Sequence, residues 1–409
     1  MCIVSRLKGQ LHNVPLGLLL CLCAAHCCND ILQAVITALY PILKSDLGLD
    51  FAQIGLVTLV YQLAASLLQP VVGYFFDKHP KPYSLWIGMT FTTAGICMLA
   101  FVSDFRLLLL TVAFVGVGSS ILHPEASRIT SVCSGGKRGL AQSVFQVGGN
   151  FGSSVGPLLV ALIVAPFNRT CVLWFLIISA TAFAVMRPII KWFGGYITRQ
   201  KALAARSDTR RPMPLSHGKT VMTVVVLMLL IISKYTFMAC MTSYYTFFVI
   251  GEFGVSVSAS QIMLFVFVVS TAAGTLVGGP FGDKYGRKVV IWVSILGAAP
   301  FALLLPYMPL AGTVACSFFA GFMLSSAFPA ILLYAQELLP TKLGMISGLF
   351  FGFAFGVGGI ASAVLGDFAD RYGIEAIYNF CAYTPLLGII AAFLPNLKKR
   401  PKSRDTHSA

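Results

Sequence analysis

The chain has 409 residues, of which 57% are hydrophobic and only 11% are charged, and its mean hydropathy is +0.85. Because soluble domains carry about 25% charged residues, this composition excludes a water-soluble globular protein. The formal net charge of +15 could suggest a nucleic-acid partner, but the basic residues are spread between apolar segments. We therefore expect an integral membrane protein that contacts the lipid bilayer and binds no nucleic acid.

Twelve apolar segments are predicted to cross a hydrocarbon core of about 30 Å as helices, which satisfy their own backbone hydrogen bonds. The predicted spans are 16–40, 52–76, 83–102, 105–128, 138–164, 170–193, 220–250, 258–281, 288–306, 309–334, 342–368 and 374–395. A polar stretch follows the sixth span. We therefore expect an N-terminal six-helix bundle (1–193), a basic cytoplasmic linker (194–219) and a C-terminal six-helix bundle with a cytoplasmic tail (220–409).

The distribution of Lys and Arg predicts the orientation of the chain. If both termini are cytoplasmic, most basic residues lie on the cytoplasmic side, as the positive-inside rule requires. The basic run Arg199–Arg211 and the tail Lys398–Arg404 would then face anionic lipid. The first apolar stretch is too long, and too polar in its middle, for a cleavable signal peptide.

A short motif occurs once in each half of the chain. Gly73–Lys81 corresponds to Gly279–Lys288, and each copy lies where one apolar segment ends and the next begins. A second correspondence relates Gly116–Pro124 to Gly321–Pro329. Two parallel repeats of six helices predict a transporter whose substrate site lies between the halves, near the middle of the membrane.

No motif for a nucleotide or a metal is present. The sequence contains neither G-x-x-x-x-G-K-[ST] nor H-E-x-x-H, so an ion gradient, rather than ATP, is the expected energy source. The eleven cysteines lie mostly inside apolar segments and point in several directions, which disfavours a closed metal site. We expect no cofactor, no metal and no enzymatic activity.

Two ionisable residues lie deep in predicted helices, where charge is costly and usually functional. Asp30 in helix 1 and Lys234 in helix 7 lie at matching depths of the two repeats, so we expect them to pair across the central cavity. The alternative is a static structural ion pair. Asp30 is the predicted proton-coupling residue, assisted by His26 one turn earlier. His26 could instead only hold the rotamer of Asp30.

Polar side chains on other predicted helices are candidates for binding substrate. Three of them recur every four residues on one face of helix 5, opposite a face of glycines. The candidate substrate-binding residues are Lys234, Gln142, Gln146, Asn150, Tyr245, His123, Tyr61 and Gln62. For the methionine and aromatic positions among their neighbours, ordinary packing is the alternative explanation.

Charged residues at the cytoplasmic ends of helices are predicted to form a latch that holds one conformation closed. The predicted latch residues are Asp77, Lys78, Glu125, Arg128, Asp283, Arg287 and Glu337. Positive-inside topology alone would also explain the basic members of this set. A substrate-binding role is the alternative for the two glutamates.

Two of these motifs resemble signatures of the major facilitator superfamily. Gly279–Lys288 resembles its loop 2–3 signature, whereas the first copy has Pro80 in place of the second glycine. Gly152–Pro157 resembles the GxxxGP element of the antiporter branch, although packing of small residues also explains its glycines. Ala113 stands where that branch often has an arginine, so the role of that arginine must be filled differently.

Longer blocks resemble the fosmidomycin resistance protein family. They are His26–Asp30, Gln69–Lys78, His123–Arg128, Gly139–Pro157 and Lys234–Phe247. The resemblance implies an all-α membrane protein of the major facilitator fold, with twelve transmembrane helices in two pseudo-symmetric six-helix bundles. It also implies a monomeric antiporter of the bacterial inner membrane that exports the anionic drug fosmidomycin while protons enter. The departures from the family are concentrated in the Cys-rich start of helix 1 and in the tails.

Two other functions are compatible with the residues. A proton-coupled importer of a small organic anion or sugar would share the fold and the midplane pair. A membrane sensor or enzyme that transports nothing is the second alternative. Export of an anion from a negative interior is favoured by about 2.3 kcal/mol per charge per 100 mV. However, an anion that took Lys234 away from Asp30 would favour proton binding together with the drug, so antiport requires an additional conformational effect.

Overall fold

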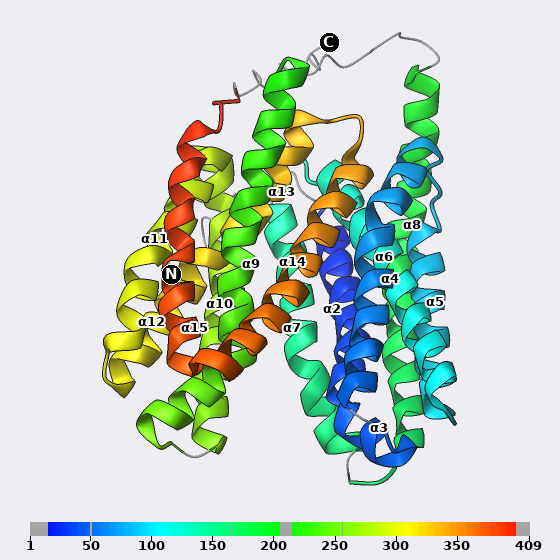
Figure 1. Cartoon of the computed structure of the whole chain (residues 1–409). Coiled ribbons are helices and arrows are strands. Elements are labelled where there is room, and N and C mark those ends of the chain that lie inside the picture. Colours follow the sequence, from blue (N-terminus) through cyan, green and yellow to red (C-terminus); the bar gives the residue numbers. More distant parts are fainter. Residues whose placement is uncertain (1–14, 50, 165, 205–214, 256, 398–409) are drawn as a thin grey trace.

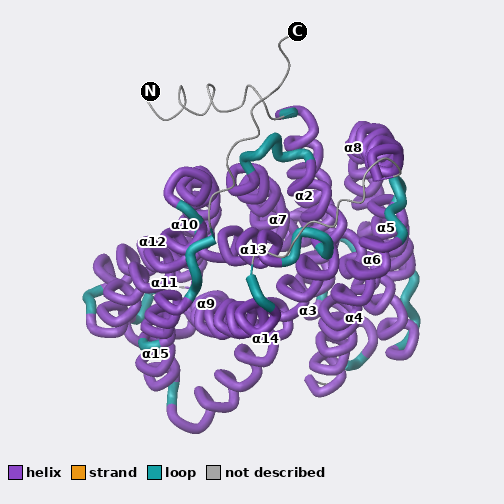
Figure 2. The backbone as a smooth tube through the Cα atoms, turned by 90° about the horizontal axis from the view of Figure 1, so that it is seen from above, coloured by secondary structure: helices purple, strands orange, loops and turns teal. Residues whose placement is uncertain are grey.

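The computed structural model describes residues 15–49, 51–164, 166–204, 215–255 and 257–397. All secondary-structure elements in these ranges are helices (Figure 1, Figure 2). The N-terminal half consists of α2 (Leu16–Ala38), α3 (Tyr40–Leu47), α4 (Phe51–Lys78), α5 (Ser84–Ala100), α6 (Phe105–Val132), α7 (Arg138–Leu159), η2 (Val160–Val164), η3 (Arg169–Phe175) and α8 (Leu176–Ala204). The C-terminal half consists of α9 (His217–Phe253), α10 (Val257–Tyr285), α11 (Arg287–Leu304), η4 (Leu305–Tyr307), α12 (Leu310–Ser325), α13 (Ala327–Leu338), α14 (Leu343–Tyr372), α15 (Ile374–Ala382) and η5 (Thr384–Phe393).

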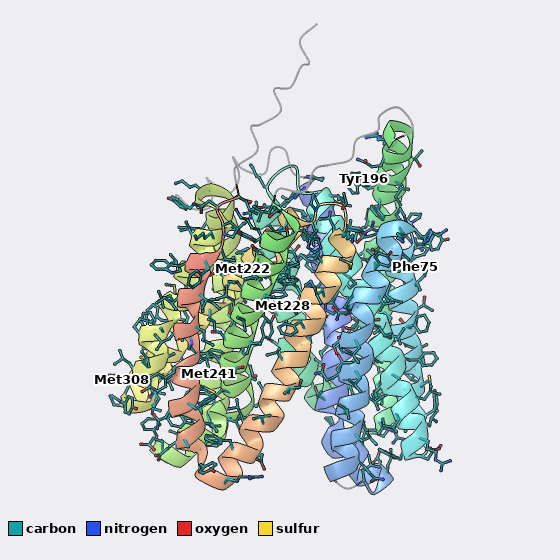
Figure 3. All side chains as sticks on the ribbon, turned by 45° about the horizontal axis from the view of Figure 1, so that its top comes forward. Phe75, Tyr196, Met222, Met228, Met241 and Met308 are labelled. Atoms are coloured by element: carbon teal, nitrogen blue, oxygen red, sulfur yellow. The ribbon has the colours of Figure 1, made fainter. Side chains whose placement is uncertain are left out.

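These elements give the predicted all-α membrane architecture. Within the described ranges, ten helical segments are long and apolar enough to cross a membrane. Two further helices complete six crossings in each half: α5, which has only 17 residues, and α7, which carries the polar stripe. Side chains such as Phe75 and Met222 face outward from the bundle, whereas Met241 is buried within the C-terminal half (Figure 3). The outward apolar side chains are those that lipid would cover.

Some boundaries differ from the predicted ones. Helix α8 continues to Ala204, past the predicted start of the linker, and α9 already begins at His217. Residues 205–214 and 398–409, which hold part of the predicted basic run and the basic tail, lie outside the described residues. The predicted single span 309–334 is two helices, α12 and α13.

Pro329 gives the physical reason for this break. Proline has no N–H and cannot bond the carbonyl four residues earlier, which here belongs to Ser325. That carbonyl instead lies 3.4 Å from the hydroxyl of Thr275, which donates a hydrogen bond to it. In the other half, Pro124 is accommodated inside the continuous helix α6. The two halves are therefore not symmetric beside the cavity that they share.

The two halves lie side by side and meet most closely at one end, where α8 ends and α9 begins; the ribbons separate toward the opposite end (Figure 1). We call these the linker end and the far end. Toward the linker end, the backbones of α4 and α14 are in direct contact. They are so close that a Cβ at Gly73 would clash with the carbonyl of Gly344. A Cβ at Gly348 would likewise clash with the carbonyl of Gln69. The glycines thus permit the halves to close here.

Candidate transport site

A polar cavity of about 170 Å³ lies between the two halves. Its lining comes from α2 and α7 on one side and from α9, α10, α12, α13 and α14 on the other. The lining residues are His26, Asp30, Gln146, Gly149, Asn150, Ser153, Lys234, Tyr235, Met238, Thr271, Thr275, Ser325, Phe328, Pro329, Phe351 and Phe355. The predicted location between the repeats is therefore where the structure has a polar cavity.

Asp30 lies between two histidines, His26 and His123, and we call these three residues the triad. His26 Nε2 is 3.3 Å from Asp30 Oδ2, and His123 Nε2 is 3.5 Å from Asp30 Oδ1. His26 is one helical turn before Asp30 on α2, whereas His123 comes from α6. The side chain of Asp30 is 13% exposed, and the two histidines are almost fully buried.

Each histidine ring is held by a backbone carbonyl on its other nitrogen. His26 Nδ1 is 2.8 Å from the carbonyl oxygen of Phe145, and the two rings are stacked with centroids 4.0 Å apart. His123 Nδ1 is 3.0 Å from the carbonyl oxygen of Ser119. A carbonyl can only accept a hydrogen bond. Each Nδ1 therefore carries a proton, and each Nε2 faces the carboxylate.

Side-chain amides also donate to Asp30. Asn29 Nδ2 and Gln33 Nε2 are 3.1 and 3.3 Å from Oδ1. Tyr61 donates a hydrogen bond of 2.7 Å to Gln33 Oε1, which orients the amide toward the carboxylate. Tyr61 was expected to bind substrate, but it supports Asp30 through Gln33 and is not in the cavity lining. Gln62, the neighbouring candidate, is also outside the lining.

The predicted pair between Asp30 and Lys234 is not present. The two side chains line the same cavity, but the ionisable groups described within 4 Å of the Asp30 carboxylate are the two histidines, and no described carboxylate lies within that distance of Lys234. The reason is that α6 supplies His123, a partner that the depth argument did not consider. His123, a candidate substrate ligand, contacts Asp30 in this structure.

Lys234 is a buried lysine, 6% exposed, on the C-terminal side of the cavity. Its ammonium lies 5.1 Å from the ring centroid of Tyr235 and 5.3 Å from that of Phe328. Aromatic faces attract a cation but do not neutralise its charge. A buried ammonium without a carboxylate partner is costly. This position is therefore suited to an anion that enters the cavity.

The remaining predicted substrate ligands fall into two groups. Gln146 and Asn150 line the cavity, as the polar stripe on helix 5 predicted. Gln142 lies nearer the linker end, where its side-chain oxygen accepts a hydrogen bond of 3.3 Å from Ser127. Tyr245 is completely buried in the C-terminal half and donates to the hydroxyl of Ser317. Gln142 and Tyr245 are therefore not cavity residues in this conformation.

The two aspartates of the repeated motif cap helices of the opposite half. Asp77 on α4 accepts hydrogen bonds of 2.9 Å from the N–H groups of Gly344 and Met345, at the start of α14. Asp283 on α10 accepts hydrogen bonds of 2.9 and 3.0 Å from the first turn of α7. A carboxylate there satisfies N–H groups that have no partner within the helix and complements the helix dipole. Both caps join the two halves at the linker end.

The other predicted latch residues have more local partners. Arg287 bonds Asp283 at 2.7 Å and Glu337 at 3.4 Å, all within the C-terminal half. Glu125 and Arg128 form a bidentate pair at 2.8 and 2.9 Å within α6. Lys78 is exposed, its ammonium lies over the ring of Tyr74, and it forms no ion pair with a described carboxylate.

A buried amide network at the same end was not predicted. Gln336 on α13 accepts a hydrogen bond from Ser131 and donates to Ser127 at 3.3 Å, and both serines belong to the N-terminal half. It also donates to Ser347 on α14 at 2.8 Å. The only sequence signal was a glutamine next to Glu337. Hydrogen bonds across the halves thus add to the two aspartate caps.

We expect an Asp77→Ala protein to open its linker end more often. The substitution removes two charge-assisted hydrogen bonds at a helix start, which together stabilise the closed end by about 2–3 kcal/mol. In a cysteine-free chain with a cysteine at Asn150, labelling by a membrane-impermeant maleimide from the far end should slow about tenfold or more. Asp104→Ala, which removes the cap of α6 within the N-terminal half, is the control. Unchanged labelling in the Asp77 variant would exclude the cap as a determinant of closure.

A Gly348→Ala protein is expected to behave in the same way for a steric reason. Its Cβ would overlap the carbonyl of Gln69, and overpacking of this kind costs about 1–3 kcal/mol. The clash exists only while the linker end is closed, so labelling from the far end at the Asn150 cysteine should again decrease. Gly356→Ala, on the same helix with no atom within 4 Å of its Cβ, should label like the parent protein. Equal rates for both variants would contradict the prediction.

The fold and the site together define a secondary membrane transporter, and the comparisons agree with this class. The model of the Major Facilitator Superfamily matches residues 22–251 and 227–409. The chain is 51% identical over 380 residues to the fosmidomycin resistance protein of Escherichia coli K12, covering 93% of each chain. An uncharacterised major-facilitator-type transporter of Bacillus subtilis is 38% identical, over 96% of this chain and 95% of its own length.

Solved structures show the same fold at low sequence identity. The major facilitator transporter FucP, in its outward conformation, superposes with a TM-score of 0.73 at 14% identity, over 92% of this chain and 98% of its own. The proton:xylose symporter XylE superposes with a TM-score of 0.72, also at 14% identity, over 93% and 96%. The family model and the 51% identical relative show that the chain belongs to the major facilitator superfamily and, within it, to the fosmidomycin resistance protein family. Its members are transporters rather than enzymes.

Proposed function

We propose that this protein exports a small anionic drug of the fosmidomycin type in exchange for protons, by alternating access. One observation supports this most: Lys234, which has no described carboxylate within 4 Å, and the His26 and Asp30 members of the triad line opposite sides of one cavity between the halves. The first is suited to an anion and the second to protons. The 51% identity to the fosmidomycin resistance protein indicates the cargo.

The cavity has the chemistry that a small phosphonate requires. Its anionic group would contact the ammonium of Lys234, and the anion would remove the cost of that buried charge. Amide groups of Gln146 and Asn150 and the hydroxyl of Ser153 can hydrogen-bond the polar groups at its other end. The rings of Tyr235 and Phe328 can contact its carbon chain. Specificity then depends on one charge contact and several hydrogen bonds.

The conformation and the orientation follow from the same proposal. The linker end is cytoplasmic, as the distribution of basic residues indicates, and the membrane is the bacterial inner membrane. The aspartate caps and the Gln336 network then close the cytoplasmic side, so the structure represents an outward-facing state. The monomer is the transporting unit, because both sites are formed within one chain.

Charge alone does not produce exchange. A protonated triad attracts an anion to the same cavity, which by itself favours cotransport. Antiport therefore requires that protonation of the triad favours the return to the inward-facing state and that drug binding favours the outward-facing one. Proton and drug then cross in opposite directions because the doubly loaded protein does not change conformation.

The same Coulomb argument supports a second candidate, a proton-coupled importer of a small organic anion. It needs no conformational exclusion of the doubly loaded form. Import and export differ in the direction of drug movement relative to the proton gradient, so one experiment distinguishes them.

The test uses the purified full chain in proteoliposomes with the membrane potential clamped to zero. For export by exchange, radiolabelled fosmidomycin should accumulate in vesicles whose lumen is more acidic than the bath. Accumulation only when the bath is more acidic would instead establish the importer. Flux that does not respond to either gradient would rule out proton coupling altogether.

A further inference from the structure

We infer that His26, Asp30 and His123 form a store for two protons per transport cycle, one on the Nε2 atom of each histidine. The inference rests on the proposed proton-coupled function and adds its stoichiometry. The sequence placed a single coupling carboxylate here, with His26 as an assistant. The geometry gives His123 the same role as His26, because the Nε2 atoms of both rings face the carboxylate of Asp30.

The carbonyl contacts determine where an extra proton can bind. Nδ1 of each ring faces only acceptor groups or a hydroxyl, so its proton stays in place. Without further protons, the lone pairs of both Nε2 atoms would point at the carboxylate of Asp30, and three acceptors would face each other. Such an arrangement is repulsive in a buried site. One proton on each Nε2 converts both contacts into charge-assisted hydrogen bonds.

Each histidine has its own carboxylate oxygen. His26 approaches Oδ2 and His123 approaches Oδ1, at 3.3 and 3.5 Å. The two nitrogens therefore do not compete for one oxygen, and each hydrogen bond can form as its pair of atoms moves closer. The triad then carries a net charge of about +1 when both protons are bound and about −1 when both have left, by the ordinary charges of these groups. The cycle thus changes the local charge by two.

The order of burial indicates how the protons travel. Asp30 and His26 line the cavity, whereas His123 lies behind them, 1% exposed and against the rings of Phe351 and Phe355. A proton from cavity water can bind Asp30 Oδ1 and then move to His123 Nε2, which restores the carboxylate. His26 can receive its proton directly from the cavity. Asp30 is therefore both the counter-charge and the route to the inner histidine.

The described surroundings contain few other groups that titrate. From α9, Lys234 lines the same cavity. From α2 itself, the thiol of Cys27 is near Asp30. On α4, the nearby titratable group is Tyr61, which reaches the site only by its hydrogen bond to Gln33. Helix α7 contributes the amides of Gln146 and Asn150, and α14 contributes aromatic rings. A change in protons taken up by this site should therefore follow the two histidines.

The three ligand atoms also lie within 4.8 Å of one another, a spacing that a divalent cation could bridge. A bound metal ion would draw both Nε2 atoms toward one point beside the carboxylate. Here each Nε2 instead lies next to a different carboxylate oxygen. We therefore assign the triad to protons. The experiment below is run with EDTA on both sides of the membrane, and loss of transport caused by EDTA would overturn this assignment.

The experiment measures the proton gradient that just stops drug flux. Proteoliposomes containing the full chain hold an approximately 100-fold fosmidomycin gradient at zero membrane potential, and ΔpH is varied until net flux reverses. Each proton balances a tenfold concentration ratio per pH unit, so reversal is expected near about 1 pH unit for two protons and about 2 for one. Reversal of the wild-type protein near 2 units would overturn the two-proton store and leave proton-coupled export intact. Absence of any coupled flux would instead reject the proposed function.

Single variants show whether each histidine carries one proton. His26→Gln and His123→Gln should each move the reversal point from about 1 to about 2 pH units. His217→Gln, at the exposed start of α9, is the control and should leave it unchanged. A histidine with a merely structural role would lower the rate without moving the reversal point. That result for either variant, measured on whatever residual flux remains, would overturn the assignment of its proton.

Discussion

A Lys234→Met protein is expected to bind fosmidomycin at least about 100-fold more weakly than the parent protein. Methionine keeps the length and the packing of the side chain but removes its charge. Truncating one partner of a buried charge pair costs about 3–5 kcal/mol, which corresponds to a factor of about 10²–10⁴ in the dissociation constant. Equilibrium binding of radiolabelled drug to the purified protein measures this directly, without a proton gradient.

The control for this substitution lies on the same helix. Lys219 is exposed near the start of α9, so Lys219→Met removes an equal charge without touching the cavity and should bind the drug normally. Lys234→Arg tests the geometry of the contact, because a planar guanidinium is longer and cannot replace a compact ammonium between two rings without rearrangement. If the Met variant bound the drug within about threefold of the parent, Lys234 would not be the anion site.

The architecture could be predicted from sequence because each of its signals is local. Apolar length predicts a spanning helix, and the repeated motif with its aspartates indicates two halves. Of the predicted polar stripe Gln142, Gln146 and Asn150, the last two line the cavity, whereas Gln142 does not. The break between α12 and α13 was not predicted, although Pro329 marks it, because Pro124 in the other repeat leaves its helix continuous.

The site was harder to predict because its contacts join distant parts of the chain. His26 and Asp30 are four residues apart on one helix, so their contact followed from helical spacing. His123 joins them from α6, and no spacing rule indicates that. Depth in the membrane paired Asp30 with Lys234, but depth does not give the direction in which each side chain points. Likewise, the motif predicted a latch but not its partners: both aspartates accept hydrogen bonds from backbone N–H groups of the opposite half, and Asp283 also pairs with Arg287.

An Asp30→Asn protein is expected to lose drug accumulation driven by ΔpH while it still exchanges labelled for unlabelled drug. Asparagine keeps the size and one acceptor oxygen but removes the counter-charge for both histidines. A proton on either Nε2 would then be a buried charge without a partner, at a cost of several kcal/mol. Drug exchange requires only the drug-loaded protein to change conformation, so it does not depend on this proton.

The two assays together separate loss of coupling from loss of folding. A misfolded protein would fail in both, whereas an uncoupled one keeps exchange within about a few fold of the parent rate and loses accumulation. Glu252→Gln, which removes an exposed carboxylate at the end of α9, should retain both activities. If Asp30→Asn still concentrated the drug against its gradient under ΔpH, the carboxylate would not be required for coupling. Drug exchange depends on the Lys234 side of the cavity alone, whereas drug accumulation driven by ΔpH also depends on the triad. The two measurements together therefore test drug binding on one side and proton coupling on the other.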